Sequence, residues 1–305
     1  MIKKTGDPKR QPGLSDKERV GNDRRQHSGA FGPHLVDPDT GIVLTPTGSY
    51  SSSGTWDYYT FTGDDEIQIA RLGNDPTKGA QIEALVVPGG GGNSRGGGGG
   101  GGGPAKTGTQ TVVAGQIIKI VVGAGGTGHA TIRGTRGSSS QCGSLFADGG
   151  GEPGSDAADA TEGPGPGAGG RGHATIAYRG GLNSNGHYGG ANMTSADLFC
   201  GGGAGAGAAG SSAGGGGGGA GGAGLSSSIT GSAVSYGGGG GGGNDNISSA
   251  GGAGGAGGGG TGSGSTTTDA TAGGANTGGG AGGNANGVAK NGGSGVVIIR
   301  VKRAA

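Results

Sequence analysis

The chain has 305 residues, of which 91 are glycine, 29% are hydrophobic and 4% are aromatic. A typical globular domain is about 45–50% apolar with about 7% glycine, so a core of bulky side chains does not extend through the whole chain. The formal net charge of +1 argues against a general nucleic-acid-binding protein, and every apolar run is far shorter than the ~20 residues that span a bilayer.

Residues 1–45 form a basic segment without a sustained helical or strand period. They hold eight of the 21 Lys and Arg residues of the chain, and proline and glycine interrupt them repeatedly. We interpret this segment as an extended arm, for which two alternatives remain. It is either a disordered terminus or an arm that orders against a partner protein by pairing basic side chains with carboxylates.

Seven short segments are rich in β-branched, aromatic or other apolar residues, and most alternate with the period of a half-buried strand. They are 41–44, 55–61, 66–70, 81–87, 110–113, 116–122 and 296–301. A turn at Ala114-Gly115 indicates that two of them form a hairpin or a bent strand pair. Because helical periodicity is missing, we expect a mainly β fold with essentially no α-helix. The framework is predicted to be antiparallel, jelly-roll or sandwich-like, over 46–127, and closed by a C-terminal strand in 296–305.

Glycine dominates the segment 128–295, which we expect to form the body of the molecule. Between 201 and 295 there are 44 glycines in 95 positions, and the charged residues are Asp245, Asp269 and Lys290. Because the chain returns to a strand after this tract, we favour an ordered structure for the tract over a flexible linker. Two outcomes remain: disorder, or polyglycine-II helices packed side by side through backbone hydrogen bonds. Collagen is excluded because strict G-X-Y periodicity and high proline are absent.

Patterns for catalytic or metal chemistry are weak. The segment 128–132 is repeated as 172–176, which places His129 and His173 at equivalent positions, but a metal site needs three or four ligands. Four acids between 152 and 162 suit either a calcium site or a solvated loop. They are Glu152, Asp156, Asp159 and Glu162.

The remaining patterns give no support to an enzyme. Trp56 is the single tryptophan and lies in the framework, whereas a glycosidase cleft needs aromatic platforms beside its carboxylates. Matches to G-x-G-x-x-G lack the strand and helix context of a nucleotide site. Cys142 and Cys200 are too few for a disulfide framework and are expected to be small buried thiols. We expect no catalysis, no cofactor and no metal.

Binding potential lies where polar residues interrupt the glycine runs, at 182–188, 226–236 and 244–247. These inserts combine tyrosine, asparagine, serine and glycine, the residues that antibody paratopes use for aromatic area and adaptable hydrogen bonds. The receptor-binding candidates are Asn183, Asn185, His187, Tyr188, Ile229, Tyr236, Asn244, Asp245 and Asn246. The alternative is that the inserts are simply polar turns between glycine helices.

Several motifs over about residues 50–302 resemble the glycine-rich domains of bacteriophage tail fibres and their tip adhesins. They are the aromatic strand at 55–61, V-V-P-G-G-G-G at 86–92, V-V-A-G-Q followed by alternating isoleucines at 112–126, and G-G-S-G-V-V-I-I-R at 292–300. The segment 139–145 is similar to an S-S-x-F-G segment of that family, with Cys142 in the aromatic position. The resemblance implies a β-framework carrying polyglycine helices, a role in the virion and receptor contact through distal loops.

From this resemblance we expect a non-enzymatic virion protein that is exposed on the particle and binds a host-surface polysaccharide or outer-membrane protein. The N-terminal arm would attach to other tail or capsid proteins through Lys3, Lys4, Lys9, Arg10, Arg19, Arg24 and Arg25. A homotrimer is the expected oligomer for a fibre, although no coiled-coil heptads support it. Neither nucleic-acid binding nor membrane insertion is expected.

Two alternatives from other functional classes stay open. One is a purely structural fibre protein or a decoration protein of the capsid or tail. It stays open because tip adhesins of this kind attach through a folded N-terminal domain, whereas the N-terminal segment here is expected to be an extended arm. The other is an ice-binding protein built on a flat face of polyglycine helices, for which Thr266–Thr268 are the only hint of a regular threonine row.

Overall fold

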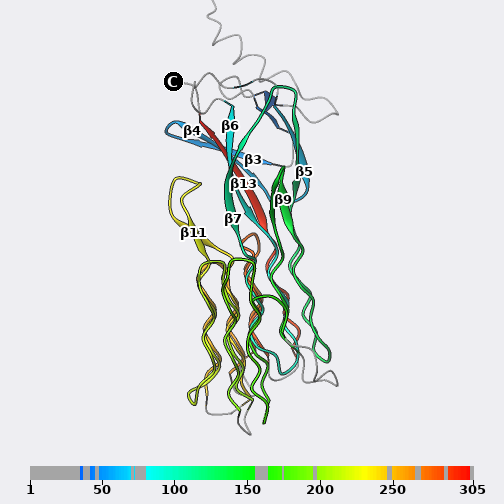
Figure 1. The fold of residues 1–305 in the computed structure, drawn as a ribbon, viewed down its shortest axis with the longest axis vertical. Helices are drawn as coiled ribbons and strands as arrows, with labels where there is room; N and C mark the ends of the chain where they lie inside the picture. Colours follow the sequence, from blue (N-terminus) through cyan, green and yellow to red (C-terminus); the bar gives the residue numbers. More distant parts are fainter. Residues whose placement is uncertain are drawn as a thin grey trace, which may run out of the picture.

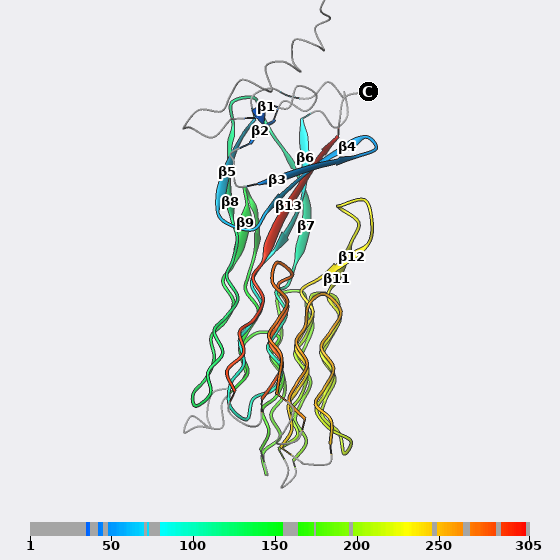
Figure 2. The same cartoon turned by 180° about the vertical axis from the view of Figure 1, so that it is seen from behind.

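The computed structural model describes residues 35–36, 42–44, 48–69, 72, 80–154, 164–173, 175–194, 198–245, 249–264, 269–284 and 288–302. In these residues the regular elements are antiparallel β-strands, and no α-helix occurs among them, as the sequence predicted. The molecule is elongated (Figure 1). A β-sandwich forms one end, and a bundle of extended glycine-rich segments, the glycine body, forms the other (Figure 2).

The sandwich consists of a six-stranded and a five-stranded sheet. The first has the order β1 (Leu35–Val36), β2 (Ile42–Leu44), β5 (Asp65–Ile69), β8 (Ile117–Val121), β9 (Ser140–Cys142) and β10 (Leu145–Ala147). The second has the order β3 (Ser49–Ser53), β4 (Trp56–Phe61), β13 (Val296–Lys302), β6 (Gln81–Val87) and β7 (Lys106–Thr111). A separate hairpin pairs β11 (Leu225–Ser227) with β12 (Val234–Tyr236).

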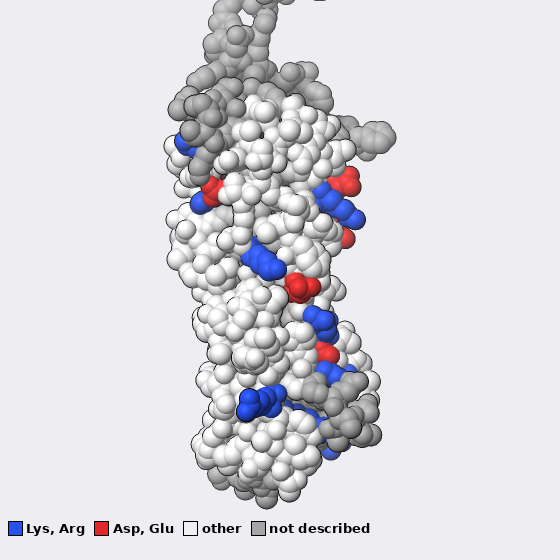
Figure 3. All heavy atoms as spheres, viewed as in Figure 1, with Lys and Arg blue, Asp and Glu red and all other residues white. Residues whose placement is uncertain are grey.

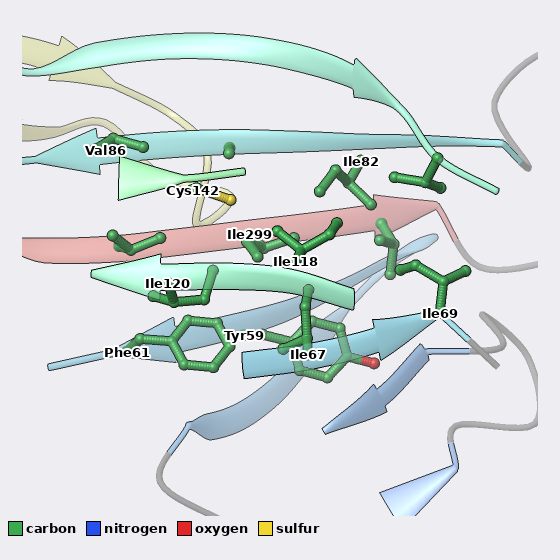
Figure 4. Close-up of a cluster of buried hydrophobic side chains, with 14 of the residues drawn as sticks. Tyr59, Phe61, Ile67, Ile69, Ile82, Val86, Ile118, Ile120, Cys142 and Ile299 are labelled. Atoms are coloured by element: carbon green, nitrogen blue, oxygen red, sulfur yellow. The ribbon is translucent and has the colours of Figure 1, made fainter. Parts of the chain in front are cut away.

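The core of the sandwich lies between the two sheets and follows from strand alternation, which sends every second side chain to the same face. Tyr59 and Phe61 of β4 enter it together with Ile299 of β13, and Ile67 and Ile118 meet them from the six-stranded sheet (Figure 4). All five side chains are at most 1% exposed. This is the bulky core that the composition allows for only part of the chain.

The last strand of the chain occupies the middle of the five-stranded sheet. β13 pairs antiparallel with β4 on one side and with β6 on the other, with Val297 opposite both Phe61 and Val86. β13 lies within the segment 296–305, for which the sequence predicted the last strand. Because β6 and β13 are neighbours, the glycine body between them begins and ends at adjacent points of the sheet.

Six of the seven expected strands match observed ones closely, and the segment 110–113 matches only the end of β7. The turn at Ala114-Gly115 is present, with Gly115 at a φ of 83°. The flanking strands do not form a hairpin with each other, because β7 and β8 belong to different sheets and the turn carries the chain across. β1 and β2 lie within the segment expected to be an arm, whose residues 1–34 are outside the described part of the chain.

Backbone hydrogen bonds hold the glycine body together with a period of three residues. The amides of residues 99–103 donate in turn to the carbonyls of Gly201, Ala281, Gly151, Ala204 and Gly278. The amides of residues 237–242 donate in turn to Thr277, Gly257, Gly222, Gly100, Gly260 and Gly219. Amides three apart thus reach the same or an adjoining segment, as three residues per turn require in polyglycine II. Each such segment has hydrogen-bonded neighbours on three sides.

Glycine is required in this packing because neighbouring backbones occupy the space of a side chain. A Cβ on Gly240 would lie 1.9 Å from the carbonyl oxygen of Ala281, and one on Gly99 would lie 1.9 Å from that of Gly240. One run shows alanine on the outward face of a helix, although other alanines of the glycine body, such as Ala204 and Ala281, are buried. In the A-G-G-A-G-G-A run at 250–256 all three alanines are exposed, while added Cβ atoms on the intervening glycines would meet carbonyl oxygens.

Replacing Gly240 by alanine is expected to destabilise the protein by about 3 kcal/mol, because a packed backbone must move to admit the methyl group. Gly215 is the matched control, since a Cβ there would meet nothing within 4 Å. Gly215→Ala is expected to change the free energy of unfolding by less than about 1 kcal/mol. Urea unfolding of the two purified variants measures both values, and equal effects would contradict the tight packing.

Candidate functional site

The predicted receptor-binding residues are divided between the two ends of the glycine body. The turn at 183–187 lies beside the sandwich: the side-chain amide of Asn185 donates to the carbonyls of Ala206 (2.9 Å) and Ala105 (3.3 Å), and Ala105 directly precedes β7. Asn183 is buried, and its Oδ1 accepts the backbone N–H groups of Asn185 and His187, each at 3.0 Å. Tyr188 is 57% exposed. The asparagines therefore fix the turn.

Ile229 and Tyr236, from the second insert, attach the β11–β12 hairpin to the outer face of the five-stranded sheet. They are 6% and 7% exposed and belong to a second apolar cluster with Leu85, Val296 and Ile298. Burial raises the pKa of the Tyr236 phenol, which keeps it protonated. Their side chains serve packing and are turned away from solvent.

The third insert lies at the far end, the end of the glycine body away from the sandwich. Asn244 is completely buried and donates to the carbonyl of Ala250 at 2.6 Å. Asp245 is half-buried and accepts the backbone N–H of Leu198 at 2.6 Å. Asn246 lies outside the described residues. Within the described residues, Asn244 and Asp245 therefore hold the end of a polyglycine segment by hydrogen bonds to neighbouring backbone.

Other buried asparagines, not singled out from the sequence, have the same role. Asn93 donates to the carbonyls of Gly282 (3.1 Å) and Val288 (3.2 Å), and its Oδ1 accepts the N–H of Lys290 at 2.8 Å. Asn284 donates to Val288 at 2.6 Å. Asn93, Asn244 and Asn284 each follow a glycine run that ends in Gly-Gly-Asn. The repeated Gly-Gly-Asn triplet is therefore the sequence signal that could have predicted where a polyglycine helix ends and an asparagine side chain binds the backbone of the turn.

The two copies of the G-H-A-T-I echo lie against the same turn at the far end. The N–H of His129 donates to the carbonyl of Asn93, and the N–H of Gly172 donates to that of Gly96, each at 3.0 Å. The isoleucine of each copy points outward: Ile132 is 56% exposed and Ile176 is 44% exposed. Sequence reasoning found this echo but examined it only for metal binding.

Arg171 and Tyr178 form a rigid cluster beside the second copy. Arg171 is 2% exposed, its guanidinium lies 4.2 Å from the centre of the Tyr178 ring, and its Nη2 donates to the Tyr178 hydroxyl. The ring of His173 meets that of Tyr178 edge-on at 5.8 Å, and its Nδ1 accepts the N–H of Ile176 at 3.1 Å. Stacking and hydrogen bonds thus fix the loop that carries Ile176.

The acidic and cysteine residues considered from the sequence have the following places in the structure. No group of three or more His, Cys, Asp or Glu side chains there is arranged to hold a metal ion. Glu152 pairs with Arg133 at 3.1 Å, while Asp156, Asp159 and Glu162 lie outside the described part. Both cysteines are buried and unbridged. Burial raises the pKa of the Cys142 thiol to about 12, with a smaller opposing effect of Gln110, so the thiol is unreactive.

The face in Figure 3 is mostly uncharged, with isolated basic and acidic residues spread along its length. Within the described residues, no helix has both the length and the apolar character that a membrane span needs.

A family model described as a glycine-rich domain matches residues 73–302, which include the whole glycine body and β13. No curated protein and no solved structure matches the chain. The family match supports the glycine-rich part of the resemblance noted from the sequence. The link to phage fibres remains a sequence-based prediction.

Replacing Asn93 by alanine is expected to destabilise the protein by about 3 kcal/mol, because the Gly282 carbonyl and the Lys290 amide lose their side-chain partner, while the Val288 carbonyl keeps Asn284. Ser184→Ala, in an exposed turn position, is the control and should change stability by less than about 0.5 kcal/mol. Thermal and urea unfolding compare the two. A cost at Asn93 as small as that at Ser184 would show that the amide does not close the turn.

Proposed function

The chain belongs to the glycine-rich domain family, and we propose that it is a phage virion structural protein, a tail-fibre or tail-tip component that binds a host-surface receptor. The motif resemblance to phage fibre domains supports the virion assignment. Its architecture suits a rigid projection with one attached and one presenting end.

The observation that carries this proposal is the separation of the two ends by a backbone-bonded bundle. The helix 237–243 begins directly after β12 beside the sandwich and ends at Asn244 at the far end. Seven residues of polyglycine II span about 22 Å. Because neighbouring segments are hydrogen-bonded along this length, the far-end loops are held at a fixed distance from the sandwich.

The receptor surface in this proposal is formed by the loops that carry Ile132 and Ile176. Contiguous exposed apolar surface rimmed by polar residues marks protein contact sites, and the proposal is that the two isoleucines together supply such a surface. Arg133 directly follows Ile132, and His173 lies three residues before Ile176, so each loop has a polar residue close to its isoleucine. An outer-membrane protein therefore suits this surface better than a polysaccharide does.

These observations test neither the attachment of the arm to a particle nor the ice-binding alternative. The basic residues expected to attach the arm to the particle lie outside the described part, as do Thr266–Thr268. Attachment stays a prediction, and the protein content of particles that carry a chain lacking residues 1–34 would check it.

The double variant Ile132→Ser, Ile176→Ser is expected to slow host adsorption of particles by about tenfold or more, because it removes two apolar anchors. Val113→Ser is the matched control: Val113 is 62% exposed but lies at the sandwich end, before the Ala114-Gly115 turn. Adsorption rates are measured on particles with equal protein content. Unchanged adsorption of the double variant would favour a purely structural decoration role.

A further inference from the structure

A groove lies between the β11–β12 hairpin and the outer face of the five-stranded sheet, at the opposite end from the proposed receptor loops. In Figure 2 the hairpin stands beside β7. The groove has a volume of about 350 Å³ and is lined mainly by Glu83, Thr107, Thr109, Ser226, Ser228 and Arg300. This volume falls within the range of about 300–1,000 Å³ that small-molecule sites occupy.

The two charged residues of the groove neutralise each other. Arg300 Nη2 and Nε donate to Glu83 Oε2 at 2.7 and 2.9 Å. The guanidinium also lies 4.5 Å from the ring centre of Trp56 and donates to the carbonyl of Ser228 at 3.3 Å. Both side chains remain about one-fifth exposed, at 23% and 20%. The groove therefore offers fixed polar groups without net charge.

Hydroxyl groups line both walls. The alternating burial of β7 turns Thr107 and Thr109 outward from the sheet, and both are exposed. Ser226 and Ser228 are exposed on the opposing hairpin. An apolar ligand would desolvate these hydroxyls without replacing their hydrogen bonds, which is costly. A charged ligand would have to compete with the Glu83–Arg300 pair.

Over the face of the sheet, where the groove lies, a peptide strand finds no unpaired backbone, and the sheet is open for further pairing only along its edge strands, of which β7 is one. β13 is already paired with β4 and β6, and β6 is paired with β13 and β7. Recognition here depends on side-chain hydroxyls and one fixed ion pair. We propose that this groove binds a neutral saccharide, whose hydroxyls donate and accept in the same geometry as the water they replace.

Ligand-observed NMR and calorimetry test this with purified full-length protein and with glucose, galactose, mannose, N-acetylglucosamine, maltose and lactose as probes. At least one is expected to bind. The double variant Thr107→Val, Thr109→Val should weaken that binding by about tenfold, since two hydroxyl hydrogen bonds are lost. Thr111→Val is the matched control, because Thr111 is exposed on the same face of β7 but outside the groove, and it should bind as the parent does.

Three results would overturn the proposal: no probe binds, the Thr107/Thr109 double variant binds as tightly as the parent, or glucuronic acid binds in the groove better than every neutral probe. The Ile132→Ser, Ile176→Ser protein provides the remaining comparison. It should keep full saccharide binding, because the two surfaces lie at opposite ends. Failure of the groove is therefore distinguishable from failure of the receptor proposal.

Discussion

Hydrogen bonds between neighbouring backbones, running on three sides of each segment, are the interaction on which the glycine body depends. Ordering a glycine is entropically expensive, and the body has few bulky side chains whose burial would compensate. What it offers is a backbone partner for each amide along inner segments such as 99–103 and 237–242, and buried peptide groups without partners are strongly unfavourable. The close approach that permits this requires the absence of Cβ, as the 1.9 Å distance at Gly240 illustrates.

The sandwich and the glycine body form one continuous structure. Val87 and Val296 lie opposite each other in the sheet, so the body leaves and re-enters at neighbouring positions. The second apolar cluster joins Leu85 of the sheet to Ala206 of the body and to Tyr236 of the hairpin. The conventional core thus fixes where the polyglycine segments start. The polyglycine segments, in turn, return the chain to the centre of the sheet, where β13 pairs with β4 and β6.

The strands 81–87 and 296–301 were predictable because they are central strands, whose burial on both faces requires short runs of apolar residues that are visible in the sequence. β3 was missed because Ser49–Ser53 is a polar edge strand with every residue exposed, and β7 because its alternation is threonine against polar or glycine residues. Composition indicated polyglycine II, but the partner of each segment depends on contacts far apart in sequence. Of the Gly-Gly-Asn ends, Asn244 was interpreted as a binding residue, since sequence alone does not show that its amide points into the bundle.

The same limits apply to the candidate sites. The echo containing Ile132 and Ile176 was visible as a repeat, but only the structure places both copies against one turn and exposes both isoleucines. The groove near Arg300 joins segments more than 70 residues apart, so no local pattern marks it.

Amide hydrogen exchange on the full-length protein tests the central claim most directly. The amides of Gly203, Gly239 and Gly242 should exchange orders of magnitude more slowly than that of Gly215; equally fast exchange at all four would contradict a body held by backbone hydrogen bonds.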